Sequence, residues 1–591
     1  MPSKKSIVLG KGYNGETYET KSFKDTIRTR PDLYIGSNIK LSDSKYWIYN
    51  KISDIIEKVK CSYVPGCIKL FDEIVTNAAD NVKRCYDSDY PTTTININLD
   101  KESGIIKVSN DGMGFPIYQV EDCDNRYLPE ILICEENSGS NLDDSAQERT
   151  WGGRNGIGIK AVNYLSSFFS IRTYDYDKGL YYSQKMIDGE PSSPKIKKTS
   201  KPHNTTIVYK PLYKEIFNMD SLDETTIKII HRRCWDIAAS LAGYGVTINY
   251  CGELIQIKSH KRYVKKIFPN MAKENYIRKK GKRGKCYYDI FILSSSKKIN
   301  FSIINGIFVS SGTHFREIDK QIKRYIRGKY GNDIQTGDIT SKYAIVLFMD
   351  ILNPGFDGQT KEKLTTPPKD YGIKIELDDA TLSEMDEFDS FQKMISQFDR
   401  NKLKSELKKH KINPTIWAKY SPAPHAGKKG KKCYLIITEG DSAKAPILNA
   451  RGNNPIYGIF PLRGKPKNVT GLNPVKLFDD TYVTLIKIMN LDFGKSYRTQ
   501  KERDTLNYSG GIIIACDQDL DGSHIKGLIV NFFAIYWPAL LKNDNFIYQF
   551  ITPLIKANGK WFFTESRYKE YIKDLRKRPN TKYYKGLGTS T

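Results

Sequence analysis

Two continuous apolar runs in the last third of the chain each end in carboxylates. The first is CYLIITEGD, residues 433–441, and the second is GGIIIACDQDLDG, residues 510–522. An uninterrupted run of this kind is typical of a strand that is buried on both faces in a parallel sheet. Open parallel sheets bind ligands at the carboxyl ends of their strands, where these two acidic ends would meet. The pattern therefore predicts an α/β fold with an acidic crevice.

Length and composition place the chain among large globular proteins. Its 591 residues predict two to four domains, and 39% hydrophobic with 27% charged residues is ordinary for a soluble protein. No apolar run approaches the roughly 20 residues that span a bilayer, and no secretory leader is visible, so we expect an intracellular protein without a membrane anchor. The ten cysteines lack zinc-site spacing and are expected to be reduced.

The formal net charge is +26, which favours a polyanionic partner, with nucleic acid as the first candidate. The alternative is a lysine-rich composition imposed by an AT-rich genome. Two lysine-rich insertions, RKKGKRGK at 278–285 and GKKGKK at 427–432, are open to the same two interpretations: contact with DNA or simple solvation.

Breaks in pattern divide the chain, which has no internal repeat. Up to residue 250, helical segments at 70–86, 158–166 and 225–241 alternate with strand-like runs, as in an α/β sandwich. A smaller α/β domain is predicted at 251–405, ending in a long charged helix over 379–409. A linker rich in Pro, Gly and Lys follows at 406–430, then a further domain at 431–545 and a last segment at 546–591.

Three clusters in the first part of the chain carry candidate ligand chemistry. The segment FDEIVTNAADN, residues 71–81, places polar side chains on one helical face, although an ordinary amphipathic helix has the same pattern. VSNDGMGFP, residues 108–116, ends a strand in Asn and Asp followed by glycines that allow a close approach of the backbone. GGRNGIGIK, residues 152–160, opens a helix and offers N–H groups to phosphates.

In this order the clusters match E-x-x-x-N, D-G-x-G and G-x-x-G-x-G and resemble the GHKL ATPase family, whose fold is the Bergerat α/β sandwich. The resemblance implies that Glu73 is the general base for the attacking water, that Asn77 holds Mg²⁺ and that Asp111 reads the adenine amino group of ATP. Phosphoryl transfer to water needs positioning and charge neutralisation, which these groups supply. The resemblance also implies nucleotide contacts from Asp80, Asn81, Arg84, Asn110, Ser140, Asn141, Gly153, Arg154, Asn155, Gly156, Gly158, Lys160 and Thr205.

Further segments narrow the resemblance to type IIA DNA topoisomerases of the eukaryotic form. They are RPDLYIGS at 30–37, SIINGIFVSSGTHF at 302–315 and NPGFDGQTKEKL at 353–364; Ser311 stands where eukaryotic members often have Gly. The resemblance implies that the first packs near the nucleotide of a dimer partner. It also implies that Lys361 reaches the γ-phosphate catalytically from a transducer domain with a ribosomal S5 domain 2-like fold, supported by Gln359.

Three acidic and basic segments follow: TEGDSAK at 438–444, PLRGK at 461–465 and DQDLDGSH at 517–524. Carboxylates this close repel by about 4 kcal/mol per pair at an effective dielectric near 20, and a cation removes the repulsion. Oxygen ligands favour Mg²⁺ over zinc. An exposed acidic turn is one alternative, and a calcium loop is another, although the closing glutamate of such a loop is missing. The segments resemble the Rossmann-like TOPRIM domain. The resemblance implies that catalytic Glu439 binds one or two Mg²⁺ with Asp517, Asp519 and Asp521, while Arg463 and Lys465 contact DNA phosphates.

Taken together, the resemblance implies the ATPase and Mg²⁺-binding portion of a type II topoisomerase, a homodimer through its ATPase domain that passes double-stranded DNA. The tyrosine-bearing breakage-and-rejoining half is not recognisable, so we expect it from a second polypeptide or from the rest of a longer chain, with 546–591 as the incomplete start of the DNA-gate region. The alternative function is a non-cleaving ATP-dependent clamp or chaperone of the MutL or Hsp90 type, which the TOPRIM-like segments disfavour. The nucleus, a viral factory and the cytoplasm are all compatible with the sequence.

Overall fold

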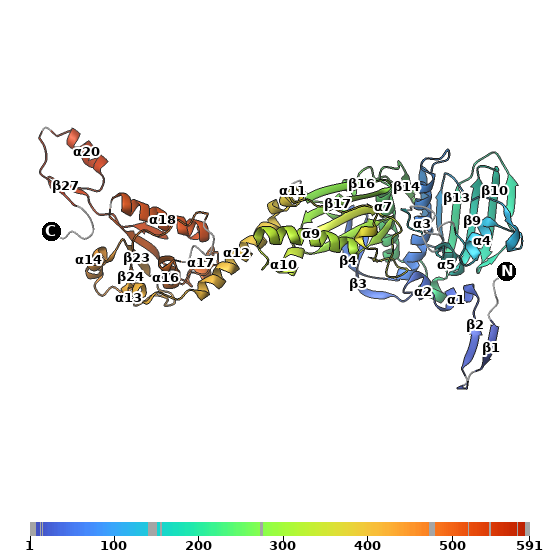
Figure 1. The fold of residues 1–591 in the computed structure, drawn as a ribbon, viewed down its shortest axis with the longest axis horizontal. Helices are drawn as coiled ribbons and strands as arrows, with labels where there is room; N and C mark the ends of the chain where they lie inside the picture. The colour runs from blue at the N-terminus through green and yellow to red at the C-terminus, as the bar shows by residue number, and fades with distance from the viewer. Residues whose placement is uncertain are drawn as a thin grey trace. The chain divides into compact units, whose positions relative to one another are not determined.

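The structure is a computed structural model, and it describes residues 7–11, 13–14, 16–139, 150–153, 156–271, 276–471, 479–517, 519–542, 545–575 and 577–584. The chain forms two compact units, Met1–Gln392 and Lys393–Thr591. Both units mix helices and sheets, as the α/β interpretation predicts (Figure 1). None of the helices among the described residues combines the length and apolarity needed to cross a bilayer.

The first unit contains a nine-stranded sheet that is antiparallel except for one parallel pair, β14 with β5. Its strands, in pairing order, are β11 (Glu190–Pro191), β10 (Leu180–Ile187), β9 (Ser166–Asp175), β13 (Thr205–Pro211), β6 (Ile106–Asn110), β5 (Thr94–Leu99), β14 (Thr247–Tyr250) and β15 (Glu253–Ile255), with β12 (Lys195–Lys198) beside β10. Three helices pack against it and against one another: α3 (Pro65–Cys85), α5 (Gly158–Tyr164) and α7 (Glu224–Ser240).

A second sheet in the same unit has five strands, and β18 and β21 are its parallel pair. The strands, in pairing order, are β16 (Tyr276–Arg283), β17 (Cys286–Ser294), β21 (Tyr343–Asp350), β18 (Ile299–Ile304) and β19 (Ile307–Val309). β21 is buried along its whole length, as expected of a central strand. Residues of both sheets belong to one hydrophobic core, which α7 joins through its contacts with β18 and β19.

The helices around the second sheet are α8 (His260–Ile267), α9 (Thr313–Tyr330), α10 (Thr336–Thr340) and α11 (Asp379–Ser383). The continuous helix predicted over 379–409 is interrupted. A short 3-10 turn, Glu384–Glu387, follows α11, and α12 (Asp389–Lys409) begins after it. The reason is Phe388, whose backbone is extended (ψ 123°) and whose side chain is buried in the core. Burial of this ring outweighs the helical propensity of its neighbours.

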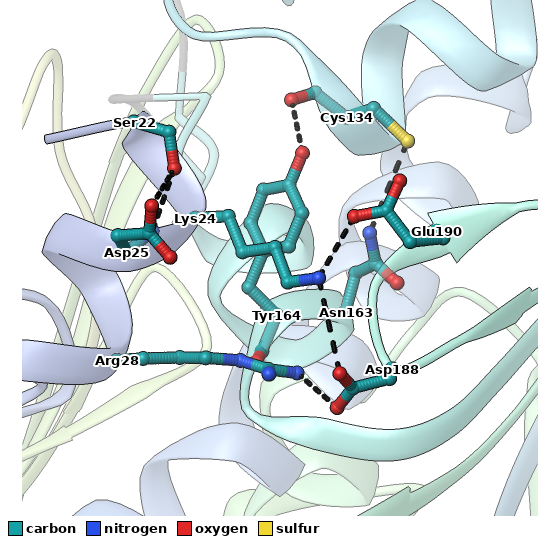
Figure 2. Close-up of polar contacts among 9 residues, drawn as sticks. All are labelled: Ser22, Lys24, Asp25, Arg28, Cys134, Asn163, Tyr164, Asp188 and Glu190. Carbon is teal, nitrogen blue, oxygen red and sulfur yellow. Dashed lines mark hydrogen bonds and ion pairs between the residues drawn. The ribbon is translucent and has the colours of Figure 1, made fainter. Parts of the chain in front are cut away.

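The N-terminal segment consists of the hairpin β1 (Ile7–Lys11) and β2 (Thr17–Thr20), then α1 (Phe23–Thr29) and α2 (Asp32–Ile35), then the hairpin β3 (Leu41–Asn50) and β4 (Ile55–Tyr63). Salt bridges fix α1 to the turn between β10 and β11 (Figure 2). Lys24 lies 2.8 Å from Glu190, and Arg28 lies 2.7 Å from Asp188 while its Nε donates to the carbonyl of Tyr164 at 2.8 Å. The following helix, α2, lies beside α3 and α5.

The second unit contains a four-stranded, fully parallel sheet, which the two apolar runs predict. Its strands, in pairing order, are β24 (Tyr457–Pro461), β23 (Tyr434–Thr438), β25 (Gly511–Ala515) and β26 (Ile547–Gln549). After α12, most of which belongs to this unit, its described helices include α13 (Pro414–Lys419), α14 (Asp441–Arg451), α16 (Asp480–Met489), α17 (Gln500–Arg503), α18 (Leu520–Tyr536) and α19 (Pro538–Leu541). A smaller antiparallel sheet, β28 (Lys560–Phe562), β27 (Ile555–Ala557) and β29 (Thr581–Tyr583), with α20 (Glu565–Lys573), follows.

Candidate nucleotide site and candidate metal site

The polar face of α3 lines a cavity of about 560 Å³ in the first unit. Residues at a spacing of three or four share one face of a helix, and the opposite face of α3, with Leu70, Phe71 and Val75, is buried in the core. The predicted site residues on the cavity face are Glu73, Asn77, Asp80, Asn81 and Arg84. The helical spacing therefore brings these residues together along one wall of the cavity.

Glu73 lies between two lysines. Its Oε1 is 2.5 Å from the Nζ of Lys69, one turn earlier on α3, and 3.9 Å from the Nζ of Lys361. Burial raises the pKa of Glu73, but the positive charges of Lys69 and Lys361 lower it further, so that the pKa falls to about 2. Glu73 is therefore a carboxylate at neutral pH.

Asp80 fixes the glycine-rich segment against α3. Its two carboxylate oxygens accept hydrogen bonds from the backbone N–H groups of Gly152 at 3.0 Å and Gly153 at 2.9 Å. Farther along, a Cβ atom at Gly158 would lie 1.9 Å from the Oε2 of Glu73. Glycine at this position is therefore required for α5 to begin beside the carboxylate.

Lys160 enters the cavity from the first turn of α5. Its Nζ donates to the carbonyl oxygens of Ser138, at 2.8 Å, and of Gly156. Burial lowers the pKa of Lys160 to about 8, and the negative charge of Glu135 offsets only part of this shift. A buried cation that donates to carbonyl groups is a favourable site for an anion.

The end of β6 places two of the predicted residues differently. Asn110 lines the cavity, but Asp111 does not. The carboxylate of Asp111 instead accepts from the backbone N–H groups of Thr93 at 2.8 Å and Thr94 at 2.9 Å, and from the hydroxyl of Thr93 at 2.5 Å. Successive residues of a strand face opposite sides, so Asn110 and Asp111 cannot both face the cavity. Thr205, which is paired with Asn110 across β13 and β6, also lines the cavity.

Lys361 and Gln359 reach the cavity from the loop that follows β21. The loop is anchored by the parallel pairing of β20 (Ser311–Gly312) with β22 (Lys363–Leu364). Lys361 is buried, its Nζ donates to the carbonyl of Gly152 at 3.0 Å, and its backbone has φ +57°. A non-glycine residue in this left-handed region costs about 1 kcal/mol or more and is typical of functional positions.

Tyr34 and Lys69 were not predicted as site residues, and four predicted site residues lie outside the described residues. Tyr34, within the octapeptide RPDLYIGS, lines the cavity of its own chain. Lys69 was missed although its position, four residues before Glu73, indicates a side-chain pair on a helix. Outside the described residues are Ser140, Asn141, Arg154 and Asn155.

The second unit brings the two predicted acidic ends together. β23 and β25 are parallel neighbours with Thr438 opposite Ala515, so Glu439 and Asp517 follow at the same edge of the sheet. Burial raises the pKa of Glu439, and the negative charges of Asp519, Asp517 and Asp521 raise it further. The Oε2 of Glu439 is buried and has no hydrogen-bond partner among the described residues. A buried carboxylate oxygen facing other carboxylates fits a divalent cation.

Asp519 and Asp521 have other partners in this structure. Asp519 caps α18, because its Oδ1 accepts from the N–H of Gly522 at 2.7 Å, and Asp521 forms an ion pair with Lys465 at 2.7 Å. As a result, the part of the chain that the structure describes contains no group of three or more His, Cys, Asp or Glu placed to hold a metal ion. Lys465, predicted to contact DNA, is directed at this carboxylate, whereas Arg463 is exposed.

Both units of the chain resemble known proteins. Residues 434–552 match the family model described as Toprim domain. The chain is 34% identical to DNA topoisomerase 2 of Arabidopsis thaliana over 622 aligned positions, covering 100% of this chain and 41% of the relative, and 34% identical to DNA topoisomerase 2 of Acanthamoeba polyphaga mimivirus, covering 97% and 47%. The chain thus spans less than half the length of these curated relatives.

The solved structures similar to this chain are ATPase regions. The crystal structure of the ATPase region of Saccharomyces cerevisiae topoisomerase II matches with a TM-score of 0.58 and 30% identity, covering 65% of this chain and 98% of that one. The ATPase and transducer domains of DNA topoisomerase II from Balamuthia mandrillaris match with a TM-score of 0.58 and 29% identity over 64% and 96%. The fold predicted from the GHKL, transducer and TOPRIM segments is confirmed, and the chain belongs to the DNA topoisomerase II family.

Proposed function

We propose that this chain is the ATP-hydrolysing and metal-binding portion of a type II DNA topoisomerase, which uses ATP to pass one DNA duplex through another. The observation that carries the proposal is the meeting of Glu73, Lys361 and the glycine-rich segment in one cavity. A candidate base, a candidate phosphate-binding cation and a glycine-rich segment around one cavity are the parts that phosphoryl transfer to water requires.

In the proposed reaction, ATP occupies the cavity with its phosphates toward the glycine-rich segment and α5. Glu73 orients a water molecule and accepts its proton as the water oxygen bonds to the γ-phosphorus, and the bond from that phosphorus to the bridging oxygen of ADP breaks. Lys160 and Lys361 are the cations that face the growing negative charge. Asn77 would hold Mg²⁺, which supplies further neutralisation of phosphate charge when it is bound. We assign contact with the adenine to Asn110 and Thr205 in place of Asp111.

Lys361 links hydrolysis to motion in this proposal. Without nucleotide its Nζ is shared between Glu73 and the carbonyl of Gly152. With ATP bound, the γ-phosphate offers a stronger partner, and the loop and the strand pair β20–β22 are held against the nucleotide. Loss of the γ-phosphate removes that partner. The contact between Lys361 and the γ-phosphate therefore favours one position of the second sheet while ATP is bound, and hydrolysis releases the sheet from it.

In the second unit we propose that Glu439, Asp517 and Asp519 bind one or two Mg²⁺, with Asp521 released from Lys465 when DNA approaches. Mg²⁺ held by these carboxylates would supply Lewis-acid polarisation of the scissile phosphate. Lys465 and Arg463 would then face DNA phosphates.

The proposed organisation follows the family. Residues 1–250 form the ATPase domain, 251–405 the transducer, 406–430 a linker, 431–545 the TOPRIM domain and 546–591 the start of the DNA gate. Double-stranded DNA, a second copy of the chain and a tyrosine-bearing breakage-and-rejoining half are the proposed partners, and the nucleus, a viral factory or the cytoplasm is the proposed place of action.

The test compares the parent protein with Glu73→Ala and Asp517→Ala. We expect ATPase activity that DNA stimulates, lost in Glu73→Ala while a non-hydrolysable ATP analogue still binds. We expect Mg²⁺-dependent DNA cleavage once the tyrosine-bearing half is supplied, lost in Asp517→Ala with the ATPase rate retained. An unchanged ATPase rate in Glu73→Ala, or unchanged cleavage in Asp517→Ala, would contradict the assigned roles.

A further inference from the structure

The turn between β9 and β10 lies at the edge of the nucleotide cavity and is closed by one carboxylate. The Oδ1 of Asp175, the last residue of β9, accepts hydrogen bonds from the N–H groups of Asp177 at 3.1 Å and Lys178 at 3.0 Å. Its Oδ2 accepts from the N–H of Ile117 at 2.8 Å, which ties the turn to the segment that follows β6. Tyr176 lies within this turn, is half-buried and lines the cavity.

Two other tyrosines hold the ring of Tyr176. The ring of Tyr90 stacks on it, with 4.1 Å between the centroids and 29° between the planes. The ring of Tyr174 meets it edge-on at 4.9 Å and 83°, and Tyr174 is itself buried, with its hydroxyl donating to the carbonyl of Thr199 at 3.0 Å. The carbonyl of Tyr90 accepts from the N–H of Met113, another cavity residue, at 3.0 Å. Tyr176 therefore has a fixed orientation at the edge of the cavity.

Tyr176 lies next to the strand ends that the proposed function assigns to the base. Thr205 is paired with Asn110 across β13 and β6, and its hydroxyl is 2.9 Å from the hydroxyl of Thr173 on β9. These three residues thus form a row across the ends of three strands, and Tyr176 follows Thr173 by three positions. Burial raises the pKa of Tyr176, and the negative charge of Asp111, next to Asn110, raises it further. The ring is therefore close to the end of β6 as well as to the end of β9.

The polar groups at this end of the cavity already have partners within the protein. The Nδ2 of Asn110 donates to the carbonyl of Asp111 at 2.8 Å, and the hydroxyl of Thr205 is hydrogen-bonded to that of Thr173. The carboxylate of Asp111 is engaged by the start of β5. Hydrogen bonds to a base are therefore limited here, and contact with its flat surface has to contribute much of the binding. An aromatic ring offers such contact, and stacking on it does not depend on the edge of the base.

We propose that the ring of Tyr176 stacks on the base of the bound nucleotide, with Tyr90 as a positioning residue behind it, and that this contact selects purine over pyrimidine nucleoside triphosphates. The proposal rests on the proposed function and adds a determinant of base selection. A purine has two fused rings and covers more of an aromatic ring than a single-ring pyrimidine does, so it gains more from stacking. The contact favours adenine and guanine alike, and the choice between them falls to Asn110 and Thr205.

The test compares four variants of the whole chain with the parent. Tyr176→Ala removes the ring, Tyr176→Phe keeps it without the hydroxyl, and Tyr90→Ala and Tyr90→Phe do the same for the ring behind it. The matched control is Tyr86→Ala. Tyr86 is 48% exposed, makes a ring contact with Tyr244 at 4.9 Å and lies outside the described cavity lining. Calorimetry gives the dissociation constants of non-hydrolysable ATP, GTP and CTP analogues, and KM, kcat and the melting temperature are measured for each protein.

We expect Tyr176→Ala to bind the ATP and GTP analogues about tenfold more weakly or worse, and the CTP analogue less than about threefold more weakly. Its KM for ATP should rise while kcat stays within about twofold of the parent, because the base is far from the reacting phosphate. Tyr90→Ala should show the same preference for losing purines to a smaller extent. Both phenylalanine variants should bind as the parent does, and so should Tyr86→Ala.

Three results would overturn the proposal. The first is parental affinity for all three analogues in Tyr176→Ala. The second is an equal loss for purines and pyrimidines, which would reduce the ring to part of the cavity's shape. The third is an equal loss in Tyr86→Ala, which would reduce the effect to stability. If the melting temperature of Tyr176→Ala falls, Tyr176→Leu replaces it, because leucine keeps apolar volume without a flat ring and should show the same selective loss.

Failure of the proposed function would be recognised separately. In that case the parent protein would bind none of the three analogues and would not hydrolyse ATP. Normal binding and hydrolysis by the parent, with unchanged selectivity in Tyr176→Ala, would overturn only the role of the tyrosine pair.

Discussion

Lys69 and Glu73 form a buried ion pair one turn apart on α3, with the Nζ of Lys69 2.5 Å from the Oε1 of Glu73. The pair keeps the proposed base ionised inside the cavity, because burial alone would raise its pKa. It also weakens Glu73 as a base, since a carboxylate with a pKa of about 2 has little affinity for a proton. Lys69 and Lys361 thus keep Glu73 ionised, but they also make it a weaker base.

Replacement of Lys69 by Met should shift the pH profile of ATP hydrolysis. With the nearest cation removed, burial dominates and the pKa of Glu73 rises, so the carboxylate becomes protonated at higher pH than in the parent. The expected result is that kcat falls about tenfold per pH unit below the new pKa of Glu73. In the parent, the same fall is expected only near pH 2. Lys69→Arg keeps the charge and should keep the parental profile; an identical profile for Lys69→Met would show that Lys69 does not tune the base.

Binding of ATP should weaken above pH 8 because of Lys160. Burial lowers the pKa of this amine to about 8, so it loses its charge as the pH rises through that value in the nucleotide-free protein. The protonated form is the one that attracts the triphosphate, and each further pH unit then weakens binding by up to about tenfold. Titration calorimetry with a non-hydrolysable analogue measures the effect. Lys160→Arg, which stays charged, should bind equally at pH 7 and pH 9, and a parental slope in that variant would place the titrating group elsewhere.

Substitutions at Asn110 and Asp111 should have different effects, one on ATP binding and the other on the stability of the first unit. Asn110→Ala removes a polar group from the cavity and should weaken ATP binding by about tenfold, equivalent to about 1.4 kcal/mol. Asp111→Ala removes three hydrogen bonds that join β5 and β6, and should lower the free energy of unfolding by about 2 kcal/mol without weakening ATP binding. Urea unfolding and analogue binding measure the two effects, and a reversed assignment would restore Asp111 as the adenine contact.

Helical faces and strand ends could be predicted from the sequence, whereas the choice between Asn110 and Asp111 could not. The face of α3 was predictable because helical spacing fixes which residues share a side, and the acidic ends of β23 and β25 because parallel strands end at one edge. The choice between two adjacent strand-end residues depends on the exact register, which a pattern leaves open. The place of Lys361 was predictable only through resemblance, because its cavity partner Gly152 lies 209 residues away.

The acidic edge of the second unit should respond to metal through Glu439. Without a divalent cation, Glu439→Gln relieves repulsion from Asp517 and Asp519 and should raise the melting temperature of the second unit. In the parent, Mg²⁺ should raise that temperature, because a ligand bound only to the folded state stabilises it. The variant should lose this increase. Calorimetry with Mg²⁺ and with a chelator measures both effects, and an Mg²⁺-dependent increase retained in Glu439→Gln would remove Glu439 from the site.

Lys83 and Asp350 form a buried ion pair between α3 and β21, with 2.7 Å between Nζ and Oδ2 and both side chains less than 5% exposed. The pair joins the helix that carries Glu73 to the second sheet. Removing one partner leaves an uncompensated buried charge, so Lys83→Met and Asp350→Leu should each destabilise the first unit by about 3–5 kcal/mol.

The double variant, Lys83→Met with Asp350→Leu, should regain most of that stability, because two apolar side chains of similar volume replace the pair without a stranded charge. Urea unfolding of the three variants measures their free energies of unfolding. The ATPase rate of the double variant, with and without DNA, then shows whether the pair only fills space or also aligns the two sheets. If the pair only fills space, the double variant hydrolyses ATP at the parental rate and is stimulated by DNA as the parent is. If the charge pair aligns the two sheets, stability returns while DNA stimulation does not.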